Sequence, residues 1–327
     1  METEAGGRER PRPNALSATV AICTHNRAAL LGETLTTLAH AGRRHAGPVE
    51  VLVVDDHCTD GTCERVQVFA QAHPDIELRL LRSPTPGLSH ARNTALAAAR
   101  GEVICFLDDD VLVPEAWLDE LLSGLSLGAN VGAVAGRVQL LWPSQPRPRW
   151  LEERHESLLS KWEWGEKSCL LPFPGFVGCN FALRREAAAS VGQFTTNLGR
   201  VGACLLSGED IDYASRLAQA GYAIAYSATG YVYHRVMPER MTLGWLLRRS
   251  FWGGASEYLV SARERLSPQW LQPWYPLFRL RKLIWSSLRA LLAPLAFSRK
   301  RLVRAWLRQA KVLGLLYGWW LERRGRG

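Results

Sequence analysis

The sequence predicts an α/β fold built on a doubly wound, mostly parallel sheet flanked by helices, and three observations support this prediction. Short apolar segments alternate with helical segments along the first third of the chain, the order that parallel strands joined by helices require. The segment at residues 103–107 is too short for a typical helix and apolar throughout, as expected of a strand buried on both faces. Polar clusters follow three of the strands, at the edge where such sheets place their ligands.

The expected elements follow one another in a regular order. We expect strands at residues 18–22, 49–54, 77–82 and 103–107, and helices at about residues 28–41, 62–72 and 87–100. Turn residues such as Asp60 and Gly61 lead from strand to helix. Farther along the chain, a helix is expected to end at Ala220 before Gly221, and residues 230–233 have the composition of a strand.

Length and composition fit one large domain, or one domain with an appendage. Of the 327 residues, 47% are hydrophobic and 22% are charged, as in ordinary globular proteins. The odd number of cysteines, seven without metal-site spacing, favours reduced thiols in a cytoplasmic setting. Residues 1–16 are expected to be disordered, without the apolar core of a signal peptide. No uncharged apolar run approaches the roughly 18 residues that span a bilayer.

Three consecutive carboxylates, Asp108, Asp109 and Asp110, follow the strand at residues 103–107. Adjacent like charges repel one another, so a compensating partner is needed. A divalent cation that carries a diphosphate is one candidate, and a solvated acidic turn before the next helix is the alternative. No glycine-rich phosphate-binding loop follows the first strand. Phosphate would therefore be held by metal and side chains.

The polar motifs, taken in order, resemble those of family 2 glycosyltransferases, which are inverting enzymes of the GT-A fold that use nucleotide-diphosphate sugars. The resemblance covers about residues 17–240 and rests on Cys-Thr-His-Asn-Arg at 23–27, Val-Val-Asp-Asp at 53–56, Thr-Asp-Gly-Thr at 59–62, Ala-Arg-Asn at 91–93 and Leu-Asp-Asp-Asp at 107–110. It continues through Gly-Cys-Asn at 178–180 and Gly-Glu-Asp-Ile-Asp at 208–212 to His234. It implies a GT-A glycosyltransferase domain over residues 17–240.

By position in these motifs, the resemblance implies a nucleotide-sugar site. Asp56 would read the base, although His57 and Cys58 depart from the family's commoner small residues and leave the base open. An aspartate that only closes a turn is the alternative for Asp56. The remaining residues implied for nucleotide-sugar binding are Thr24, Asn26, Arg27, Arg92, Asp108, Asp109 and Asn180. Asn180 would lie in the floor of the donor-sugar and acceptor pocket, or else complete a buried hydrogen-bond set.

The resemblance also implies a metal site for Mg²⁺ or Mn²⁺. Asp110 would bind the ion that bridges the diphosphate, and Asp108 or Asp109 would contact the ribose or the metal. His234 matches a position where a histidine often approaches the metal or the diphosphate, and a structural histidine is the alternative. An ion at this site would neutralise the charge that develops on the departing nucleoside diphosphate.

A second carboxylate cluster lies at residues 207–212. An inverting transfer needs one general base that takes the proton of the acceptor hydroxyl. The resemblance makes Asp210 this base, with Glu209 nearby to orient the acceptor or the protein, whereas Asp212 is expected to be structural. Acidic residues at a helix N-terminus also interact favourably with the helix dipole, and both accounts can hold.

Two further segments have distinctive compositions. Residues 140–171 are rich in Trp and Pro, which favours either an acceptor-side wall, because Trp rings suit sugars and lipid headgroups, or a surface insertion that packs its own aromatic residues. From residue 241 onward, 17 Lys and Arg face 3 Asp and Glu, a charge of +14, whereas the first 240 residues carry −5. Eight of the 13 Trp residues lie in this C-terminal segment.

The basic segment at residues 241–327 is expected to form helices. Residues 277–292 have an apolar and a basic face, and a basic stripe follows at Arg301, Arg304, Arg308 and Lys311. Such helices with interfacial Trp lie on anionic membranes, and packing on the catalytic domain is the alternative. Nucleic acid is not expected as a partner, because no recognised nucleic-acid-binding module accompanies the charge.

Together these features predict a metal-dependent, inverting glycosyltransferase that uses a nucleotide-diphosphate sugar and a polysaccharide or lipid-linked acceptor. We expect it to be cytoplasmic and peripheral at the inner face of the plasma membrane. A nucleotidyltransferase and a catalytically inactive sugar- or lipid-binding homologue are the alternatives. The sequence leaves the sugar, the acceptor and the oligomeric state open.

Overall fold

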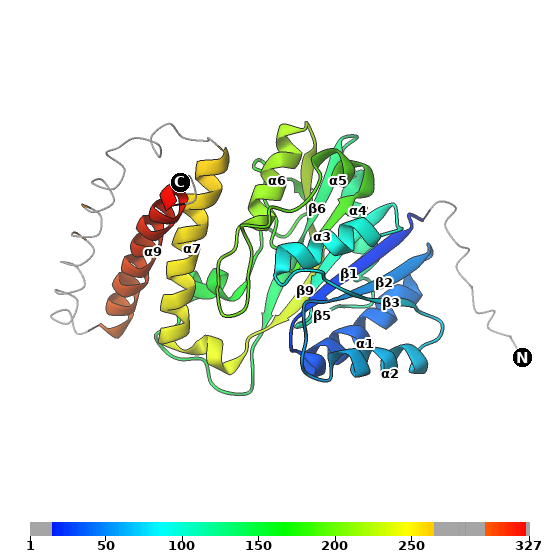
Figure 1. Ribbon diagram of the computed structural model, residues 1–327, viewed down its shortest axis with the longest axis horizontal. Coiled ribbons are helices and arrows are strands. Elements are labelled where there is room, and N and C mark those ends of the chain that lie inside the picture. Colours follow the sequence, from blue (N-terminus) through cyan, green and yellow to red (C-terminus); the bar gives the residue numbers. More distant parts are fainter. Residues whose placement is uncertain (1–14, 265–280, 282–284, 286–297, 325–327) are drawn as a thin grey trace, which may run out of the picture.

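The computed structural model describes residues 15–264, 281, 285 and 298–324, and this part of the chain is built on one mixed sheet (Figure 1). Half of the sheet is parallel, in the order β3, β2, β1, β4. The bounds of these strands are β1 Ala18–Thr24, β2 Val49–Asp55, β3 Glu77–Arg82 and β4 Val103–Asp108. The parallel order places the carboxyl ends of β1, β2 and β4 at one edge, as the sequence predicts.

The other half of the sheet mixes directions. Next to β4 come β8 (Asn180–Arg184), β6 (Val131–Leu141), β9 (Ala223–Arg235) and β5 (Val111–Leu112), and β7 (Cys169–Leu170) also pairs with β9. β8 runs antiparallel to both β4 and β6, whereas β6 and β9 are parallel. The strand predicted at residues 230–233 is part of β9, but β6 and β8 were not predicted from their composition.

Helices cover both faces of the sheet. One face packs against α1 (Ala28–Arg44), α2 (Thr62–Ala72) and α4 (Trp117–Ser123), which the 3-10 turn η1 (Gly124–Ser126) follows. The other packs against α3 (Leu88–Ala98), α5 (Arg185–Val191) and α6 (Glu209–Gln219). Val20 and Ile22 belong to the first core cluster and Ala21 to the second. Side chains that alternate between two apolar layers explain why the strand is hydrophobic throughout.

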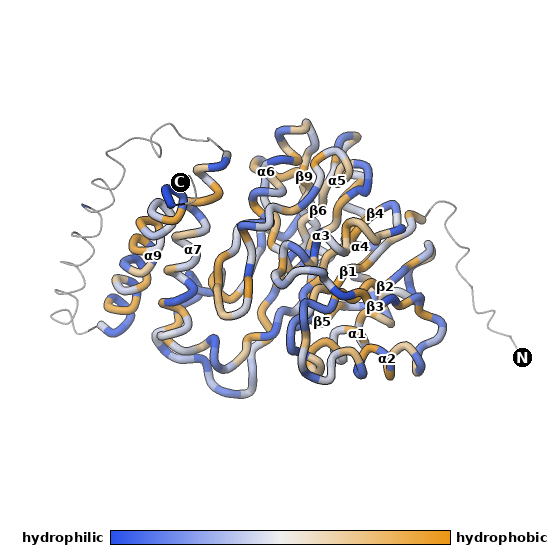
Figure 2. Tube along the Cα trace, viewed as in Figure 1, coloured by the Kyte–Doolittle hydropathy of each residue, from blue (hydrophilic) through white to orange (hydrophobic). Residues whose placement is uncertain are grey.

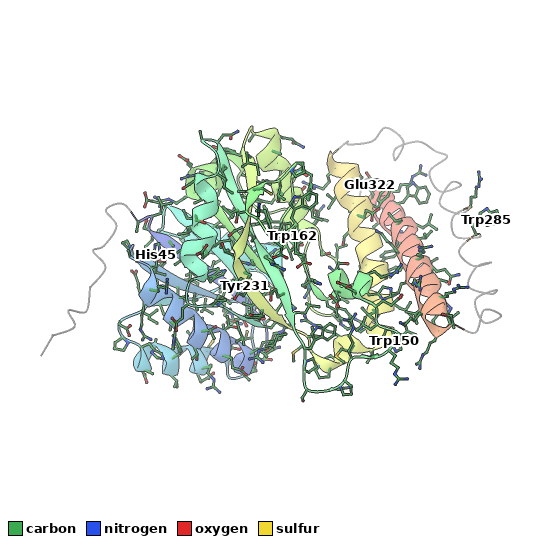
Figure 3. The ribbon with its side chains drawn as sticks, turned by 180° about the vertical axis from the view of Figure 1, so that it is seen from behind. His45, Trp150, Trp162, Tyr231, Trp285 and Glu322 are labelled. Atoms are coloured by element: carbon green, nitrogen blue, oxygen red, sulfur yellow. The ribbon has the colours of Figure 1, made fainter. Side chains whose placement is uncertain are left out.

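The predicted elements of the N-terminal half are confirmed. The four strands and three helices expected before residue 109 are present, and their ends differ from the expected ones by at most three residues. The doubly wound parallel order is also confirmed in this half. The expectations for residues 1–14 and for an amphipathic helix at 277–292 concern residues outside the described part, apart from Arg281 and Trp285, whose side chains are exposed (Trp285 is labelled in Figure 3).

The last elements are the 3-10 turn η3 (Pro238–Met241) and two long helices, α7 (Leu243–Glu264) and α9 (Arg299–Arg324). The two helices lie side by side beyond α6 (Figure 1). Val303 and Leu307 of α9 join a hydrophobic cluster with Leu246 of α7. The cluster also contains Trp150, which precedes the 3-10 helix η2 (Glu153–Leu159), and Leu159, the last residue of η2. These contacts pack the helix pair onto the rest of the protein. Within the described residues, no helix is both long enough and apolar enough to cross a membrane.

Glycines permit a very close approach of α7 and α9. A Cβ atom added at Gly254 would overlap the carbonyl oxygen of Lys311, and one added at Gly314 would overlap that of Phe251. By contrast, a Cβ at the neighbouring Gly253 would have no atom within 4 Å. The backbones of α7 and α9 are therefore in contact at Gly254 and Gly314, and Gly253 lies outside this contact.

This difference gives a matched pair of substitutions. Gly254→Ala should destabilise the protein by about 1–3 kcal/mol, because the methyl group forces two backbones apart. Gly253→Ala should stabilise it by up to about 1 kcal/mol, because alanine favours the helix and the space is open. Urea unfolding followed by circular dichroism measures both. Equal effects of the two variants would contradict the close helix contact.

Candidate functional site

A cavity of about 200 Å³ opens at the carboxyl edge of the parallel strands. We call it the central cavity. Its wall comes from the loops after β1, β2 and β4, from α3, from the loop between α5 and α6, from the start of α6 and from α7, together with Ser160 and residues 177–179. Eight of the residues predicted for the site line it: Thr24, Arg27, Asp56, Arg92, Asp108, Asp109, Glu209 and Asp210. The structure thus brings together residues up to 186 positions apart in the sequence, from 24 to 210.

The loops after β1 and β2 are bonded to each other by Asn26. This residue has a left-handed backbone with φ of 53°, and its Oδ1 accepts hydrogen bonds from the N–H groups of Thr59 at 2.6 Å and Asp60 at 3.3 Å. Asp56 lines the cavity, and its Oδ1 accepts a hydrogen bond from the N–H of Gly87 at 2.8 Å. Asn26 therefore shapes the pocket through its loop and does not line the central cavity itself.

Two of the three consecutive carboxylates are buried and bonded to protein cations. Asp109 accepts hydrogen bonds from Oγ1 of Thr24 and Nη1 of Arg27, both at 2.8 Å. Asp110 accepts from Arg27 and Arg240, each at 3.0 Å. Burial raises the pKa of Asp109 to about 6 against the opposing effect of Arg27. For Asp110 burial acts in the same direction, but neighbouring positive groups outweigh it and lower the pKa to about 2.

Asp108, Asp110 and His234 form a cluster that suits a divalent metal. One ligand atom from each lies within 4.8 Å of the others. Oδ1 of Asp110 and Nδ1 of His234 are buried and have no hydrogen-bond partner among the described residues. Burial lowers the pKa of His234, so the imidazole is neutral and has a free lone pair near pH 7. Carboxylate oxygens with an imidazole fit a divalent ion such as Mg²⁺ or Mn²⁺, whereas Asp109 lies outside this cluster.

The second carboxylate pair begins α6. Glu209 is 3% exposed and accepts a hydrogen bond from Nη1 of Arg92 at 2.6 Å. Nη2 of Arg92 donates to the carbonyl of Gly178 at 2.9 Å, and the N–H of Gly178 donates to Oδ2 of Asp210 at 3.0 Å. Burial, followed by the charge of Glu209, raises the pKa of Asp210 to about 6. A carboxylate with this pKa, facing a cavity, can accept a proton near neutral pH.

Asn180 lies inside the fold, and this corrects its expected place in the pocket. It is 0% exposed and accepts a hydrogen bond from Nε1 of Trp117 at 3.0 Å. Its Nδ2 donates to the carbonyl oxygens of Arg137 at 3.0 Å and Gly230 at 2.9 Å. Because its amide joins α4, β6 and β9, Asn180 has a structural position, the alternative that the sequence left open.

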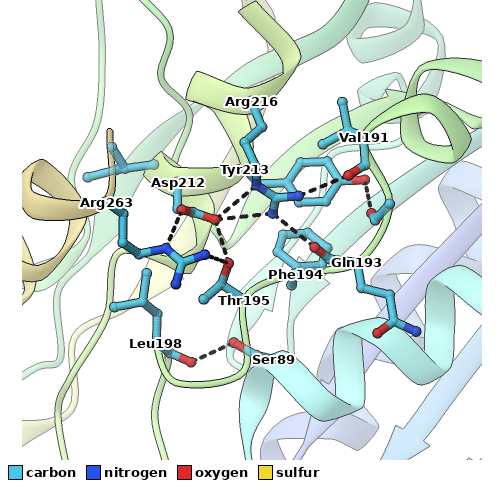
Figure 4. A network of polar contacts seen from close by, with 12 residues as sticks. Ser89, Val191, Gln193, Phe194, Thr195, Leu198, Asp212, Tyr213, Arg216 and Arg263 are labelled. Carbon is cyan, nitrogen blue, oxygen red and sulfur yellow. Dashed lines mark hydrogen bonds and ion pairs between the residues drawn. The ribbon is translucent and has the colours of Figure 1, made fainter. Parts of the chain in front are cut away.

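The loop between α5 and α6 forms the outer wall of the cavity and is fixed at both ends. Oγ of Ser89 donates to the carbonyl of Leu198 at 2.7 Å (Figure 4). Asp212 accepts hydrogen bonds from Thr195 at 2.8 Å and from Arg263 of α7 at 3.2 Å (Figure 4). These bonds hold α6, α7 and the loop in one arrangement, and they agree with the structural role expected for Asp212.

Sequence reasoning missed three arginines of the site. Arg200, on the α5–α6 loop, and Arg249, on α7, line the central cavity, and Arg240 pairs with Asp110. Nothing in the local pattern singled out Arg200 or Arg240. Arg249 was noticed only as a basic residue of the C-terminal segment.

The tryptophans of the Trp-rich segment mostly pack against other parts of the protein. Trp150 is 9% exposed, and Trp162 contacts Tyr226 edge to face at 5.3 Å (both tryptophans are labelled in Figure 3). Trp164 is 48% exposed and contacts Phe173. Ser160 is the residue of this segment that lines the central cavity. These three tryptophans do not line the central cavity, and their contacts hold the segment against the rest of the fold.

The sequence is similar to one family model and to several proteins of known name. Residues 19–192 match the family model described as Glycosyl transferase family 2. The succinoglycan biosynthesis protein ExoM of Rhizobium meliloti is 31% identical over 245 residues, which cover 74% of this chain and 74% of that protein. The glucosyl-dolichyl phosphate glucuronosyltransferase of Haloferax volcanii is 24% identical over 250 residues, which cover 75% of this chain and 77% of that protein.

A solved structure has the same fold. The mannosyltransferase PcManGT from Pyrobaculum calidifontis, in complex with GDP-Man and Mn²⁺, matches with a TM-score of 0.61 and 23% sequence identity. The match covers 98% of this chain and 92% of that one. The likeness confirms the GT-A fold that the sequence motifs implied.

The metal cluster can be tested without disturbing the ion pairs that Arg27 and Arg240 form with Asp109 and Asp110. His234→Gln and Asp108→Asn should each weaken Mn²⁺ binding by about tenfold or more, because each removes a ligand of the cluster. Neither side chain pairs with an arginine in the described part of the chain, so both variants should fold. Isothermal titration with Mn²⁺ measures the effect, with Glu186→Gln, an exposed acid on α5, as the control. Unchanged affinity in both variants would contradict the assignment.

Proposed function

Because the chain belongs to glycosyl transferase family 2, it is a glycosyltransferase, and we propose that it moves a sugar from a nucleotide-diphosphate donor to an acceptor hydroxyl with inversion at the anomeric carbon. One observation carries this proposal. Asp108, a member of the metal cluster, and Asp210, a carboxyl group with a pKa of about 6, line the same cavity. A single displacement needs stabilisation of the leaving group and a base for the acceptor, one on each side of the reacting carbon.

The donor nucleotide is proposed to lie between the loops after β1 and β2. Asp56, Arg27 and Asp108 line the central cavity. Asp56 would read the base, and Arg27 and Asp108 would contact the ribose and the diphosphate. The other retained residues of the predicted donor set would act by holding these groups in place: Thr24, Asn26, Arg92 and Asp109. The name of the Pyrobaculum mannosyltransferase, with GDP-Man and Mn²⁺, agrees with such a donor.

Asp108, Asp110 and His234 are proposed to hold Mg²⁺ or Mn²⁺, which when bound neutralises the charge that develops on the leaving nucleoside diphosphate. Asp210 accepts the proton of the acceptor hydroxyl while the hydroxyl oxygen attacks the anomeric carbon. The bond from the acceptor oxygen to carbon forms as the bond from carbon to the diphosphate oxygen breaks.

Asp210 is held for this step by its neighbours. The N–H of Gly178 fixes Oδ2 at 3.0 Å, and the ion pair of Arg92 and Glu209 fixes both Gly178 and the first residue of α6. Glu209 also contributes a negative charge that favours the protonated product form of Asp210. These contacts orient the base before the acceptor arrives.

The acceptor is proposed to be a growing polysaccharide or a lipid-linked saccharide. ExoM is named as a protein of succinoglycan biosynthesis, and the Haloferax enzyme is named for a glucosyl-dolichyl phosphate. Hydrolysis of the donor without acceptor is the measurement that distinguishes this enzyme from the catalytically inactive sugar- or lipid-binding homologue that the sequence left as an alternative. The nucleotidyltransferase alternative is excluded by the family assignment.

We propose that α9 places the enzyme on an anionic membrane surface, at the inner face of the plasma membrane. Hydrophobic and hydrophilic residues alternate around this helix (Figure 2). Trp306, Leu313 and Trp320 are 37%, 46% and 39% exposed. Arg324 stacks over Trp320 at 4.2 Å, and Arg301 is also exposed. Exposed tryptophan among arginines suits the headgroup region, and the cytoplasmic leaflet carries the anionic lipids.

Asp210→Asn tests the proposed base. The variant should retain its fold and bind nucleoside diphosphate with Mn²⁺, but transfer should slow by about 10²- to 10⁴-fold, because no group takes the proton. For the unmodified protein, kcat/KM should rise with pH through about 6, since Asp210 must be ionised to act and its pKa is raised to about 6. The residual activity of the variant should lack this inflection. Steady-state transfer at pH 5–8 measures both, and a normal rate in the variant would refute the assignment.

Vesicle sedimentation tests the membrane surface. The protein should bind vesicles of phosphatidylglycerol and phosphatidylcholine, but not pure phosphatidylcholine, and the binding should weaken with salt. The double variant Trp306→Ser, Trp320→Ser should bind several-fold more weakly, because the apolar anchors are lost. Trp164→Ser, which removes a tryptophan of the body of the protein that is even more exposed, at 48%, serves as the control. Equal binding of all three proteins would contradict the proposal.

A further inference from the structure

Two arginines in the wall of the central cavity lack a negative partner. Arg200 comes from the α5–α6 loop and Arg249 from α7. Nη1 of Arg249 donates to Oγ of Ser207 at 3.1 Å and to the carbonyl of Leu205 at 3.4 Å, both uncharged. Among the residues that the structure describes, no carboxylate lies within ion-pair distance of either guanidinium group. The cavity wall therefore contains two positive charges that have no ion-pair partner within the described part of the chain.

The charges around Arg200 and Arg249 favour the binding of an anion. Arg92, another arginine of the cavity, pairs with Glu209 at 2.6 Å. Burial lowers the pKa of Arg249 to about 10, and the nearby charge of Arg200 acts in the same direction. Arg249 thus remains charged at neutral pH although it is poorly compensated. A phosphate oxyanion between two guanidinium groups relieves such repulsion and accepts their paired N–H donors.

Arg249 lies on the acceptor side of the cavity. The carboxylates whose charges act on it are those of Asp210 and Glu209, and its partner Ser207 is three residues before Asp210. Arg200 acts on both ends of the cavity, because its charge influences Arg249 and also Asp110 of the metal cluster. Arg27 and the metal cluster are proposed for the donor diphosphate, so Arg249 is available to the second substrate.

The position of Arg249 is fixed by several contacts between α7 and the wall. The N–H of Ser207 donates to Oγ of Ser256 at 2.9 Å, and Arg263 bonds to Asp212 of α6 (Figure 4). Arg249 is thus held on a rigid helix at a constant place relative to Asp210. A preorganised cation of this kind is suited to orient a bound anion.

We propose that Arg249, with Arg200 beside it, binds a phosphate group that the acceptor carries, as a monoester or diester. This inference rests on the proposed function, because it takes Asp210 as the base that the acceptor hydroxyl must reach. The phosphate would position that hydroxyl against Asp210, while the sugar of the donor lies on the other side. Recognition of the acceptor would then depend on a residue of the C-terminal helices.

The test measures binding of n-octyl phosphate to the full chain by isothermal titration, with a saturating nucleoside diphosphate and Mn²⁺ present so that the donor site is filled. UDP and GDP are both used. The unmodified protein should bind octyl phosphate but not octanol. Arg249→Gln should weaken this binding by about tenfold or more, and Arg249→Lys by less, because charge is kept but the paired donors are lost. The control is Arg248→Gln, which removes the adjacent arginine, and it should leave the binding unchanged. Arg248 donates a hydrogen bond to the carbonyl of Ala203 at 3.2 Å.

Inorganic phosphate is titrated in parallel. Binding of octyl phosphate at least as tight as that of inorganic phosphate supports an acceptor ester, whereas binding of inorganic phosphate alone would overturn the proposal. It would also be overturned if the unmodified protein does not bind octyl phosphate, or if Arg249→Gln weakens the binding of UDP or GDP as much as that of octyl phosphate. Absence of any nucleotide binding by the unmodified protein would instead refute the proposed function, so the two failures are distinguishable.

Discussion

The buried carboxylates of Asp109 and Asp110 determine how the loops around the central cavity are held. Charges out of water are stable only when they are paired, and Arg27 bonds to both of them while Arg240 bonds to Asp110. These bonds join the loop after β1, the end of β4 and the turn before α7. Among the described residues, Oδ1 of Asp110 has no hydrogen-bond partner, and it lies next to His234, whose pKa burial lowers. This free oxygen beside the imidazole makes the position suitable for a cation. The same charge balance thus stabilises the fold and prepares the site.

Much of the parallel half of the sheet could be predicted because each of its elements is local in sequence. A short apolar strand, a turn and an amphipathic helix repeat, and right-handed crossovers then leave few arrangements. The residues at the carboxyl ends of β1, β2 and β4 could be placed together for the same reason. Strands β6 and β8 could not, since β8 pairs with β4 about 80 residues away in the chain and in the opposite direction, and nothing in the local pattern specifies such a partner.

The site shows the same limit at the level of single residues. Asp108, Asp110 and His234 were predicted together and lie together. A motif could not reveal, however, that the amide of Asn180 turns inward to Trp117. This depends on which face of β8 is buried, and that is decided by neighbours distant in sequence. Arg249 could not be identified from the sequence because the basic C-terminal segment contains many arginines. Only the packing of α7 shows which of them lines the cavity.

On the proposed assignment, the loops that face the donor come from the first 110 positions, with His234 of β9 added at the metal cluster, whereas the wall on the acceptor side comes from positions 178–249. The two parts are bonded to each other by Arg92 with Glu209 and by Asp110 with Arg240. Substitutions in the loop before α6 or in helix α7 would change the acceptor side of the cavity while the loops after β1, β2 and β4 stay the same. A lineage that varies only these two elements would keep one activated sugar and deliver it to new molecules.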